Sequence, residues 1–174
     1  MQVFLIRHPR PLIAEGVCYG GLDVDCEDPA PVAERLRAQL PAGTPIISSP
    51  LQRARKLAEA IDAGARCDER LREIDFGRWE GQRWEEIDRA LLDAWAADMR
   101  DFCPHGGESV RQLETRAIDF ARWLATSDLP RVALVAHAGV LRALSGYWRS
   151  LPLEAWTQLP FAFGSLTVIE VTVP

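Results

Sequence analysis

The stretch RVALVAHAGVLRAL, residues 131–144, joins an apolar run, a histidine and a helical pattern without a break. The run 132–136 predicts a strand buried on both faces, as in a parallel sheet. His137 follows it at once, and Gly139 opens the helix that the apolar spacing predicts. Backbone N–H groups at a helix start bind anions, so we expect a phosphate-binding position here.

Apolar runs and helical spacing alternate along the rest of the chain. Strands alternating with helices predict an α/β fold with a mainly parallel sheet covered on both faces. The expected elements are a strand at 2–6, a helix at 30–40, a strand at 45–48, a helix at 50–63 with Ser49 as N-cap and Pro50 as its first residue, a helix carrying Trp84, Ile87, Leu91 and Trp95, a helix at 110–126 with a Ser109–Gln112 capping box, and a final strand at 166–173.

The first predicted strand ends in polar groups, as the strand at 132–136 does. Arg7 and His8 follow its apolar run directly. In an open α/β sheet the ligand crevice lies outside the carboxyl ends of the strands, where these residues and His137 fall. A long loop follows at 9–29, and such loops inside a compact domain are usually functional.

The overall composition excludes several classes of protein. The chain has 174 residues, which suits a single domain spanning 1–174. Its net charge of −5 gives no basic field for nucleic acid or an anionic membrane surface. We find no signal peptide and no membrane-spanning segment, and expect a cytoplasmic protein. The four cysteines form no CxxC pair, so we expect free thiols and no metal site. The oligomeric state is not indicated.

Two further stretches carry candidate chemistry. In SSPLQRARK, residues 48–56, Arg53 stands near the positive end of a predicted helix, where a cation is unfavourable unless an anion lies beside it. An exposed arginine is the alternative. In LREIDFGRWEG, residues 71–81, Glu73 and two other acids stand among large apolar groups, where a carboxyl can serve as a proton donor. A solvated turn is the alternative there.

Together these residues suit phosphoryl transfer. Arginine clamps a dianionic phosphate better than lysine does, because its guanidinium bonds two oxygens at once. The reaction also needs an in-line nucleophile and a proton donor for the leaving oxygen. A neutral imidazole is a nucleophile when its other nitrogen is held as an N–H donor. The sequence has no Walker motif to compete for this role.

With these motifs the sequence resembles the histidine phosphatase superfamily, the phosphoglycerate-mutase-like proteins. The matching pieces are LIRHP, SSPLQRA, LREIDFGRWEG, GGES and VAHAGVLR, in the family's order. The resemblance implies a three-layer α/β/α sandwich, a last strand that runs antiparallel to the rest, and no metal or other cofactor. LREIDFGRWEG with GGES looks most like the α-ribazole phosphatase branch. The resemblance therefore implies a phosphomonoesterase, with α-ribazole 5′-phosphate or a cobalamin phosphate as the suggested substrate.

The resemblance also implies a role for each matching position. His8 is the expected nucleophile, and it becomes phosphohistidine. Arg7 and Arg53 are expected to hold the phosphoryl oxygens, and His137 to hydrogen-bond the transferring group. Glu73 is expected to protonate the leaving alcohol and then deprotonate the attacking water, with Asp75 and Glu80 as rival acids.

The loop after the histidine departs from the family pattern. Pro9 replaces the usual glycine, Arg10 the usual acid or amide, Pro11 the usual hydroxyl and Ala14 the usual asparagine. Arg10 is either an extra cation for the substrate or a solvated loop residue. These departures make a catalytically silent phosphate-binding or regulatory module one alternative. Within the enzyme class, a broad sugar or nucleotide phosphatase is the other.

Aromatic residues around these motifs have two interpretations each. Tyr19 stacks on a substrate ring or only anchors the loop. The tryptophans at 79, 84 and 95 roof a pocket or pack in the core, and core packing is the default. His105, in a Pro-Gly loop, is expected at the surface.

Overall fold

The computed structural model describes residues 1–172 and contains one five-stranded sheet. The strands lie in the order β3-β2-β4-β1-β5, with β5 antiparallel to β1 and the other pairs parallel. Their bounds are β1 Gln2–Arg7, β2 Ile46–Ser48, β3 Arg66–Cys67, β4 Arg131–Ala136 and β5 Leu166–Glu170. The predicted mainly parallel sheet and its antiparallel last strand are confirmed.

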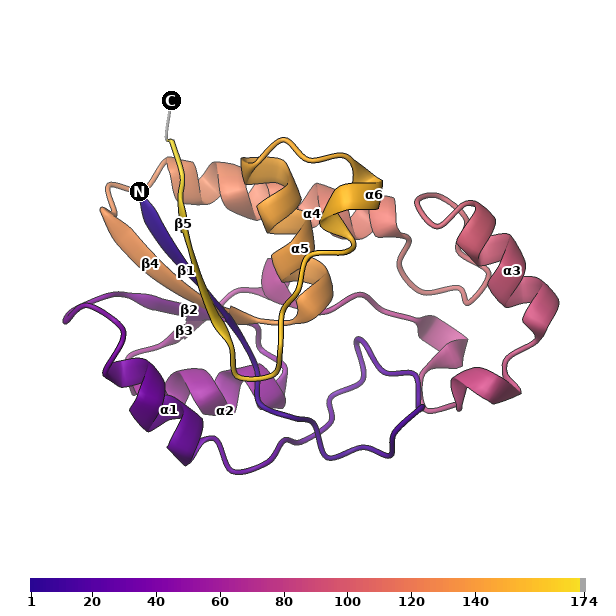
Figure 1. Ribbon diagram of the computed structural model, residues 1–174, viewed down its shortest axis with the longest axis horizontal. Helices are drawn as coiled ribbons and strands as arrows, with labels where there is room; N and C mark the ends of the chain where they lie inside the picture. The colour runs from indigo at the N-terminus through magenta and orange to yellow at the C-terminus, as the bar shows by residue number, and fades with distance from the viewer. Residues whose placement is uncertain (173–174) are drawn as a thin grey trace.

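Helices cover both faces of the sheet, with α1 and α2 on one side and α4, α5 and α6 on the other (Figure 1). The helix α3 lies away from the sheet, on the excursion between β3 and α4 (Figure 1). The bounds are α1 Ala30–Arg37, α2 Gln52–Ile61, α3 Arg89–Ala97, α4 Val110–Ala125, α5 Ala138–Trp148 and α6 Leu153–Trp156, and three 3-10 turns lie at Glu69–Leu71, Gly77–Trp79 and Trp84–Glu86.

Alternation along the strands builds a core on each face of the sheet. Phe4 and Ile6 of β1 pack with α1 and α2. Val3 and Leu5 point the other way and pack with α4, α5 and Trp156. Because successive side chains of a strand point to opposite faces, a strand that is apolar throughout needs two helical layers. The α/β/α sandwich follows from these apolar runs.

Local chemistry explains where the structure differs from the predicted elements. The helix α2 begins at Gln52 with Leu51 as its N-cap, so the prediction of Ser49 as cap and Pro50 as first helical residue is wrong. The Ser49 hydroxyl instead contacts His137. The Ser109–Gln112 capping box is confirmed. The predicted helix through Trp84 begins only at α3, after a 3-10 turn.

Two short elements, β3 and α6, were absent from the expected list because two to four residues carry too little periodicity to show a pattern. Residue 173, the end of the predicted last strand, lies outside the described residues. Within those residues, no helix combines the length and the apolar character needed to cross a membrane.

Candidate active site

The two histidines stand at equivalent positions on neighbouring strands. β1 and β4 are parallel, and their last register pair is Arg7 with Ala136. His8 and His137 are each the next residue, so the chain brings them side by side at the carboxyl edge of the sheet. Their ring centroids are 4.9 Å apart, and both side chains are buried. The sequence predicted this convergence from the shared strand-end position.

The His8 ring is held in one tautomer. Its Nδ1 lies 2.6 Å from the carbonyl oxygen of Pro9, and a carbonyl can only accept a hydrogen bond, so Nδ1 carries the proton. Nε2 therefore has the lone pair. Burial, with Arg53 and Arg7 nearby, lowers the pKa of His8 to about 3. The imidazole is consequently neutral at physiological pH, the form that a nucleophile requires.

The His137 ring is fixed through the opposite nitrogen. Its Nε2 lies 2.8 Å from the Ser49 hydroxyl, which also accepts a bond from the Leu51 N–H. The Ser49 hydroxyl has no other acceptor within residues 1–172, so it donates to Nε2, which leaves the proton on Nδ1. That Nδ1 is buried and has no partner among the described residues. Burial and the nearby Arg53 hold the pKa of His137 well below its ordinary value.

Two guanidinium groups lie beside the imidazoles. Arg53 is fully buried, and its Nη atoms donate to the carbonyl oxygens of Gly20 and Leu22 at 2.6 and 2.8 Å. Arg7 donates from Nη1 to the Phe161 carbonyl oxygen at 2.5 Å. In both arginines Nε is buried without a hydrogen-bond partner within residues 1–172. With His137 Nδ1, this makes three unpartnered buried donors from three predicted site residues.

The charges of these arginines are also unpaired. Neither Arg7 nor Arg53 forms an ion pair with a carboxylate of the described chain, although eleven ion pairs lie elsewhere. Burial lowers the pKa of both, offset in part by Tyr19 and Glu73. A buried cation without a counter-ion is costly, and a dianionic ligand removes that cost.

Glu73 is the acidic residue of the site. Its carboxylate accepts the Gly139 N–H at 2.9 Å and the Ile74 N–H at 3.0 Å, so it lies on the N-terminus of α5. A side chain at 139 would place its Cβ against the Glu73 carboxylate, so glycine leaves room for the acid in this position. The prediction that the Gly139 N–H cradles phosphate is therefore wrong in detail, because Glu73 occupies that donor.

The rival acids have other positions. Glu80 accepts the Gly21 N–H at 2.6 Å and the Phe76 N–H at 2.9 Å, so it ties the 9–29 loop to the following segment. Asp75 is exposed and accepts the Gly77 N–H in a turn. Of the three acids, Glu73 is the one bonded to α5, the helix whose N-cap is His137, which favours it as the proton donor.

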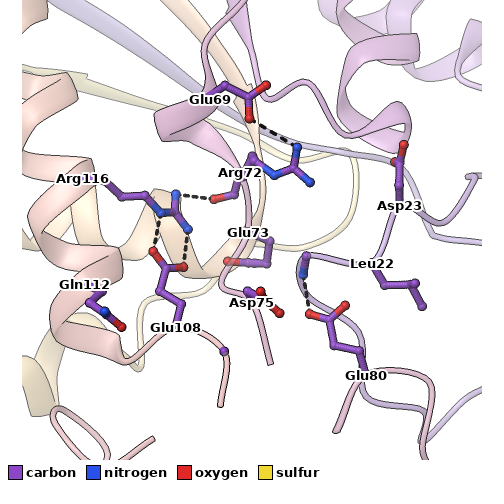
Figure 2. A pocket seen from close by; sticks show the side chains of 12 residues that line it. Leu22, Asp23, Glu69, Arg72, Glu73, Asp75, Glu80, Glu108, Gln112 and Arg116 are labelled. Atoms are coloured by element: carbon purple, nitrogen blue, oxygen red, sulfur yellow. Dashed lines mark hydrogen bonds and ion pairs between the residues drawn. The ribbon is translucent and has the colours of Figure 1, made fainter. Parts of the chain in front are cut away.

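Two pockets adjoin the site. The larger, of about 650 Å³, includes Glu73 in its wall, and Figure 2 shows its lining side chains. The smaller, of about 290 Å³, is lined by Arg10, Tyr19 and Phe163 among others. Arg10 itself is exposed and lies 3.8 Å from Glu27. The structure thus brings Arg10 and Tyr19 to one pocket.

A sequence model of the histidine phosphatase superfamily (branch 1) matches residues 3–173. The chain belongs to this superfamily. It is 36% identical over 182 residues to a glucosyl-3-phosphoglycerate phosphatase of Mycolicibacterium vanbaalenii, covering 91% of this chain and 78% of that protein. A solved mycobacterial glucosyl-3-phosphoglycerate phosphatase has a TM-score of 0.79 at 30% identity, covering 96% and 88% of the two chains.

A solved putative alpha-ribazole-5′-P phosphatase from Escherichia coli K-12 has a TM-score of 0.85 at 23% identity, covering 97% and 89% of the two chains. That similarity shows the shared fold. The family prediction and the enzyme class, a histidine phosphatase, are confirmed by these matches.

Some residues of this histidine phosphatase site were not found from the sequence. Phe163 lies with its ring centroid 5.6 Å from that of His8 and 3.8 Å from the Arg7 guanidinium. It reaches the site because Gly164 donates its N–H to the carbonyls of Arg7 and His8. The predicted antiparallel last strand could have indicated this position. A strand antiparallel to β1 begins where β1 ends, so the residues just before it lie beside His8.

The excursion that carries α3 forms a small core of its own. Trp79 packs there with Cys18 and Ile87 and with the partly buried Trp84 and Trp95. Core packing, the default for these tryptophans, is what the structure shows. The expectation that His105 lies at the surface is wrong: it is 1% exposed, with its ring 4.9 Å from that of Trp79.

The four cysteines of this phosphatase are free thiols, as predicted. Burial raises the pKa of Cys18 to about 12, so it is an unreactive core thiol. Among residues 1–172, no three histidine, cysteine or acidic side chains gather as metal ligands.

Proposed function

We propose that this protein is a metal-independent phosphomonoesterase in which His8 becomes phosphohistidine, in a single domain of residues 1–174. One observation carries the proposal: a neutral imidazole with its Nε2 lone pair available lies close to Arg7 and Arg53, whose buried Nε atoms have no partner and which form no ion pair in the described chain. A nucleophile and an unpaired cationic clamp together suit a small phosphate dianion. Family membership supports the same class of reaction.

The first step forms the phosphoenzyme. The Nε2 lone pair of His8 attacks phosphorus, and the bond from phosphorus to the leaving oxygen breaks. Glu73, as the carboxylic acid, gives its proton to that oxygen, so the product leaves as a neutral alcohol. Arg7 and Arg53 bond the equatorial phosphoryl oxygens from their unpartnered Nε–H groups, and His137 does so from Nδ1–H.

The second step releases phosphate. Glu73, now a carboxylate, takes a proton from a water molecule whose oxygen attacks phosphorus. The bond from Nε2 to phosphorus breaks and the electron pair returns to the imidazole. Because the Pro9 carbonyl keeps the proton on Nδ1, His8 returns to the tautomer in which it began. The Pro9 substitution keeps the carbonyl that this role needs, which argues against a catalytically silent module.

For the substrate we propose a small organic phosphate, with α-ribazole 5′-phosphate or a cobalamin phosphate as the first compounds to test. LREIDFGRWEG and GGES support this choice. The name of the Mycolicibacterium relative points instead to a phosphorylated sugar acid. A broad sugar or nucleotide phosphatase is the alternative, and a kinetic comparison across these compounds decides between them. We also propose that the protein acts in the cytoplasm.

Hydrolysis of an aryl phosphate in excess EDTA tests the reaction class. We expect turnover that is insensitive to EDTA and a covalent phosphate label that survives alkali but is lost in acid, as a phosphoramidate is. His8→Ala should lose both the label and the turnover. Unchanged turnover in His8→Ala would overturn the assignment of the nucleophile, and no turnover with any ester in the wild type would favour the silent module.

Glu73→Gln separates the proton donor from a structural residue. An amide oxygen still accepts the Gly139 N–H, but the side chain cannot donate the acid proton. We expect hydrolysis of alkyl phosphates to fall about 10²- to 10⁴-fold, and that of a nitrophenyl phosphate much less, because nitrophenolate leaves without protonation. Glu80→Gln is the matched control, since Glu80 holds only backbone N–H groups. Equal losses on both substrates would assign Glu73 a structural role.

A further inference from the structure

The pocket of about 650 Å³ lies where the leaving group must go, given the proposed function. Glu73 is part of its wall, and the oxygen that Glu73 protonates is the first atom of the leaving group. Arg53 joins this pocket to the phosphate clamp, because its Nη1 donates to the carbonyl of Leu22, which lines the pocket. Arg53 is fully buried and its Nε has no partner in the described chain.

The wall of this pocket is strongly acidic. Its charged lining residues are Asp23, Glu69, Glu73, Asp75, Glu80, Glu108, Arg72 and Arg116. With every acid ionised, six carboxylates against two guanidinium groups give a formal balance of −4 for the lining, and the balance is −3 while Glu73 holds the proton for the leaving group. The clamp at the other end carries unpaired positive charge, so the site is polarised from a cationic phosphate end to an anionic leaving-group end.

Both arginines of the pocket are bonded to carboxylates of the same wall. Arg116 donates to the two oxygens of Glu108 at 2.6 and 2.7 Å, and its remaining Nη1 bonds two backbone carbonyls. Arg72 donates to Glu69 at 3.3 Å. Figure 2 shows both pairings, with Arg116 facing Glu108 and Arg72 facing Glu69. These pairs neutralise the cations, so the remaining acids set the charge that a ligand meets.

The remaining carboxylates are positioned by the backbone. Asp23 accepts the Gln52 N–H through Oδ1 at 2.7 Å, and Asp75 accepts the Gly77 N–H through Oδ1 at 2.7 Å. Glu80 uses Oε1 for both of its backbone bonds. In each case the second oxygen is left to accept a bond from a ligand. The pocket therefore presents fixed acceptors to hydroxyl or ammonium donors.

We propose that this pocket selects phosphate esters whose leaving group carries hydroxyl or cationic nitrogen groups and no carboxylate. A carboxylate there meets like charges at close range, and both guanidinium groups of the wall are already bonded to carboxylates. Selection acts through repulsion of the wrong substrate as well as through bonds to the right one. The substrate class is thus set apart from the phosphorylated acids that the relative's name suggests.

Two pairs of compounds test this selection, because within each pair the main difference is one carboxylate. They are glycerol 3-phosphate against 3-phosphoglycerate, and O-phosphoethanolamine against O-phosphoserine. We expect kcat/KM to be at least about tenfold higher for the member without the carboxylate in both pairs. Equal values, or preference for the carboxylated member, would overturn the proposal.

Charge-neutral variants connect the preference to the pocket. Asp23→Asn with Asp75→Asn keeps the oxygen that accepts each backbone N–H but removes two negative charges. We expect the ratio of kcat/KM values within each pair to fall at least about threefold, mainly because KM becomes lower for the carboxylated member. Asp93→Asn with Asp128→Asn removes two charges from exposed positions outside the pocket and should leave the ratio unchanged.

The outcomes of this test are distinct from failure of the proposed function. An aryl phosphate measures the phosphohistidine chemistry without a charged leaving group, so its hydrolysis shows an active enzyme whatever the pocket prefers. Aryl phosphate turnover with no discrimination within the pairs overturns the pocket proposal alone. An unchanged ratio in the Asp23/Asp75 variant overturns it as well, because the discrimination would then arise elsewhere.

Discussion

The ends of β1 and β4 look alike in sequence and differ in structure. Each buried strand ends in a histidine, and the two rings lie 4.9 Å apart. Yet His8 is bonded through Nδ1 to a backbone carbonyl, whereas His137 is bonded through Nε2 to the Ser49 hydroxyl. The free nitrogens are therefore opposite: a lone pair on Nε2 of His8 and an N–H on Nδ1 of His137.

The roles of the two imidazoles are therefore set by the groups that neighbour them, because residue type and strand position are the same for both. The carbonyl next to His8 turns it into a lone-pair donor, which attacks. The hydroxyl next to His137 turns it into a hydrogen-bond donor, which stabilises charge. The two roles also predict different effects of substitution on activity. Activity should be lost completely at His8 and should change less at the residues that surround it.

His137→Ala should cost activity without abolishing the covalent step. It removes one buried donor to the phosphoryl group, a change that typically costs about 10²- to 10³-fold in kcat. Because His8 keeps its bond to Pro9, the variant should still acquire the phosphate label, only more slowly. Rapid-quench labelling measures this. A variant of His137 that never becomes labelled would show that the two histidines do not have separate roles.

Acid should destabilise the fold through both rings. The pKa of His8 falls from 6.5 in the unfolded chain to about 3 in the folded protein, and that of His137 is also lowered. Between these values the unfolded state binds the proton and the folded state does not. The contribution of His8 is therefore fully present above pH 6.5 and falls as pH drops toward 3, by up to about 1.4 kcal/mol per pH unit. The contribution of His137 falls with acid in the same direction.

Denaturant titrations of His8→Asn and the wild type check this slope. Between pH 6.5 and 5 few carboxylates titrate, so the histidines dominate the change. The variant should lose less free energy of unfolding over that interval than the wild type does. The same loss in both proteins would mean that His8 is protonated in the folded state and is no longer a neutral nucleophile.

The convergence of the site could be predicted from the sequence, because parallel strands place their carboxyl ends at one edge. His8 and His137 were found in this way. The predicted helix start pointed to Arg53 and the apolar neighbours to Glu73, and the family motifs then gave both residues their roles. What could not be predicted depends on contacts between distant segments. The role of Ser49 is such a case: its pattern fits a helix cap, but its hydroxyl bonds His137, 88 positions along the chain.

The same limit applies to the leaving-group pocket. Its wall combines residues 21–23 with acids from segments near 70, 80 and 108. No local periodicity relates these segments, so their shared charge appears only in three dimensions. The two short elements β3 and α6 show the complementary limit, because so few residues carry no detectable pattern.

Ser49→Ala should have an intermediate effect. It removes the hydroxyl that holds the His137 tautomer, a loss of about one hydrogen bond, or about fivefold in kcat. Ser48→Ala is the matched control, because the Ser48 hydroxyl is equally buried but bonds only backbone carbonyls. Steady-state kinetics of the two variants isolate the contact to the histidine. Equal losses would indicate general packing damage at the end of β2.

Pro9→Gly should have the smallest effect on the reaction, and it tests the His8 side of the comparison. The substitution restores the family's usual residue and keeps the carbonyl oxygen that accepts from His8 Nδ1. We expect kcat/KM to change by less than about twofold, while glycine's freedom in the unfolded chain lowers stability by about 0.5–1 kcal/mol. Kinetics and thermal unfolding measure the two effects separately. A loss in kcat as large as that of His137→Ala would show that the proline ring, and not only its carbonyl, positions the nucleophile.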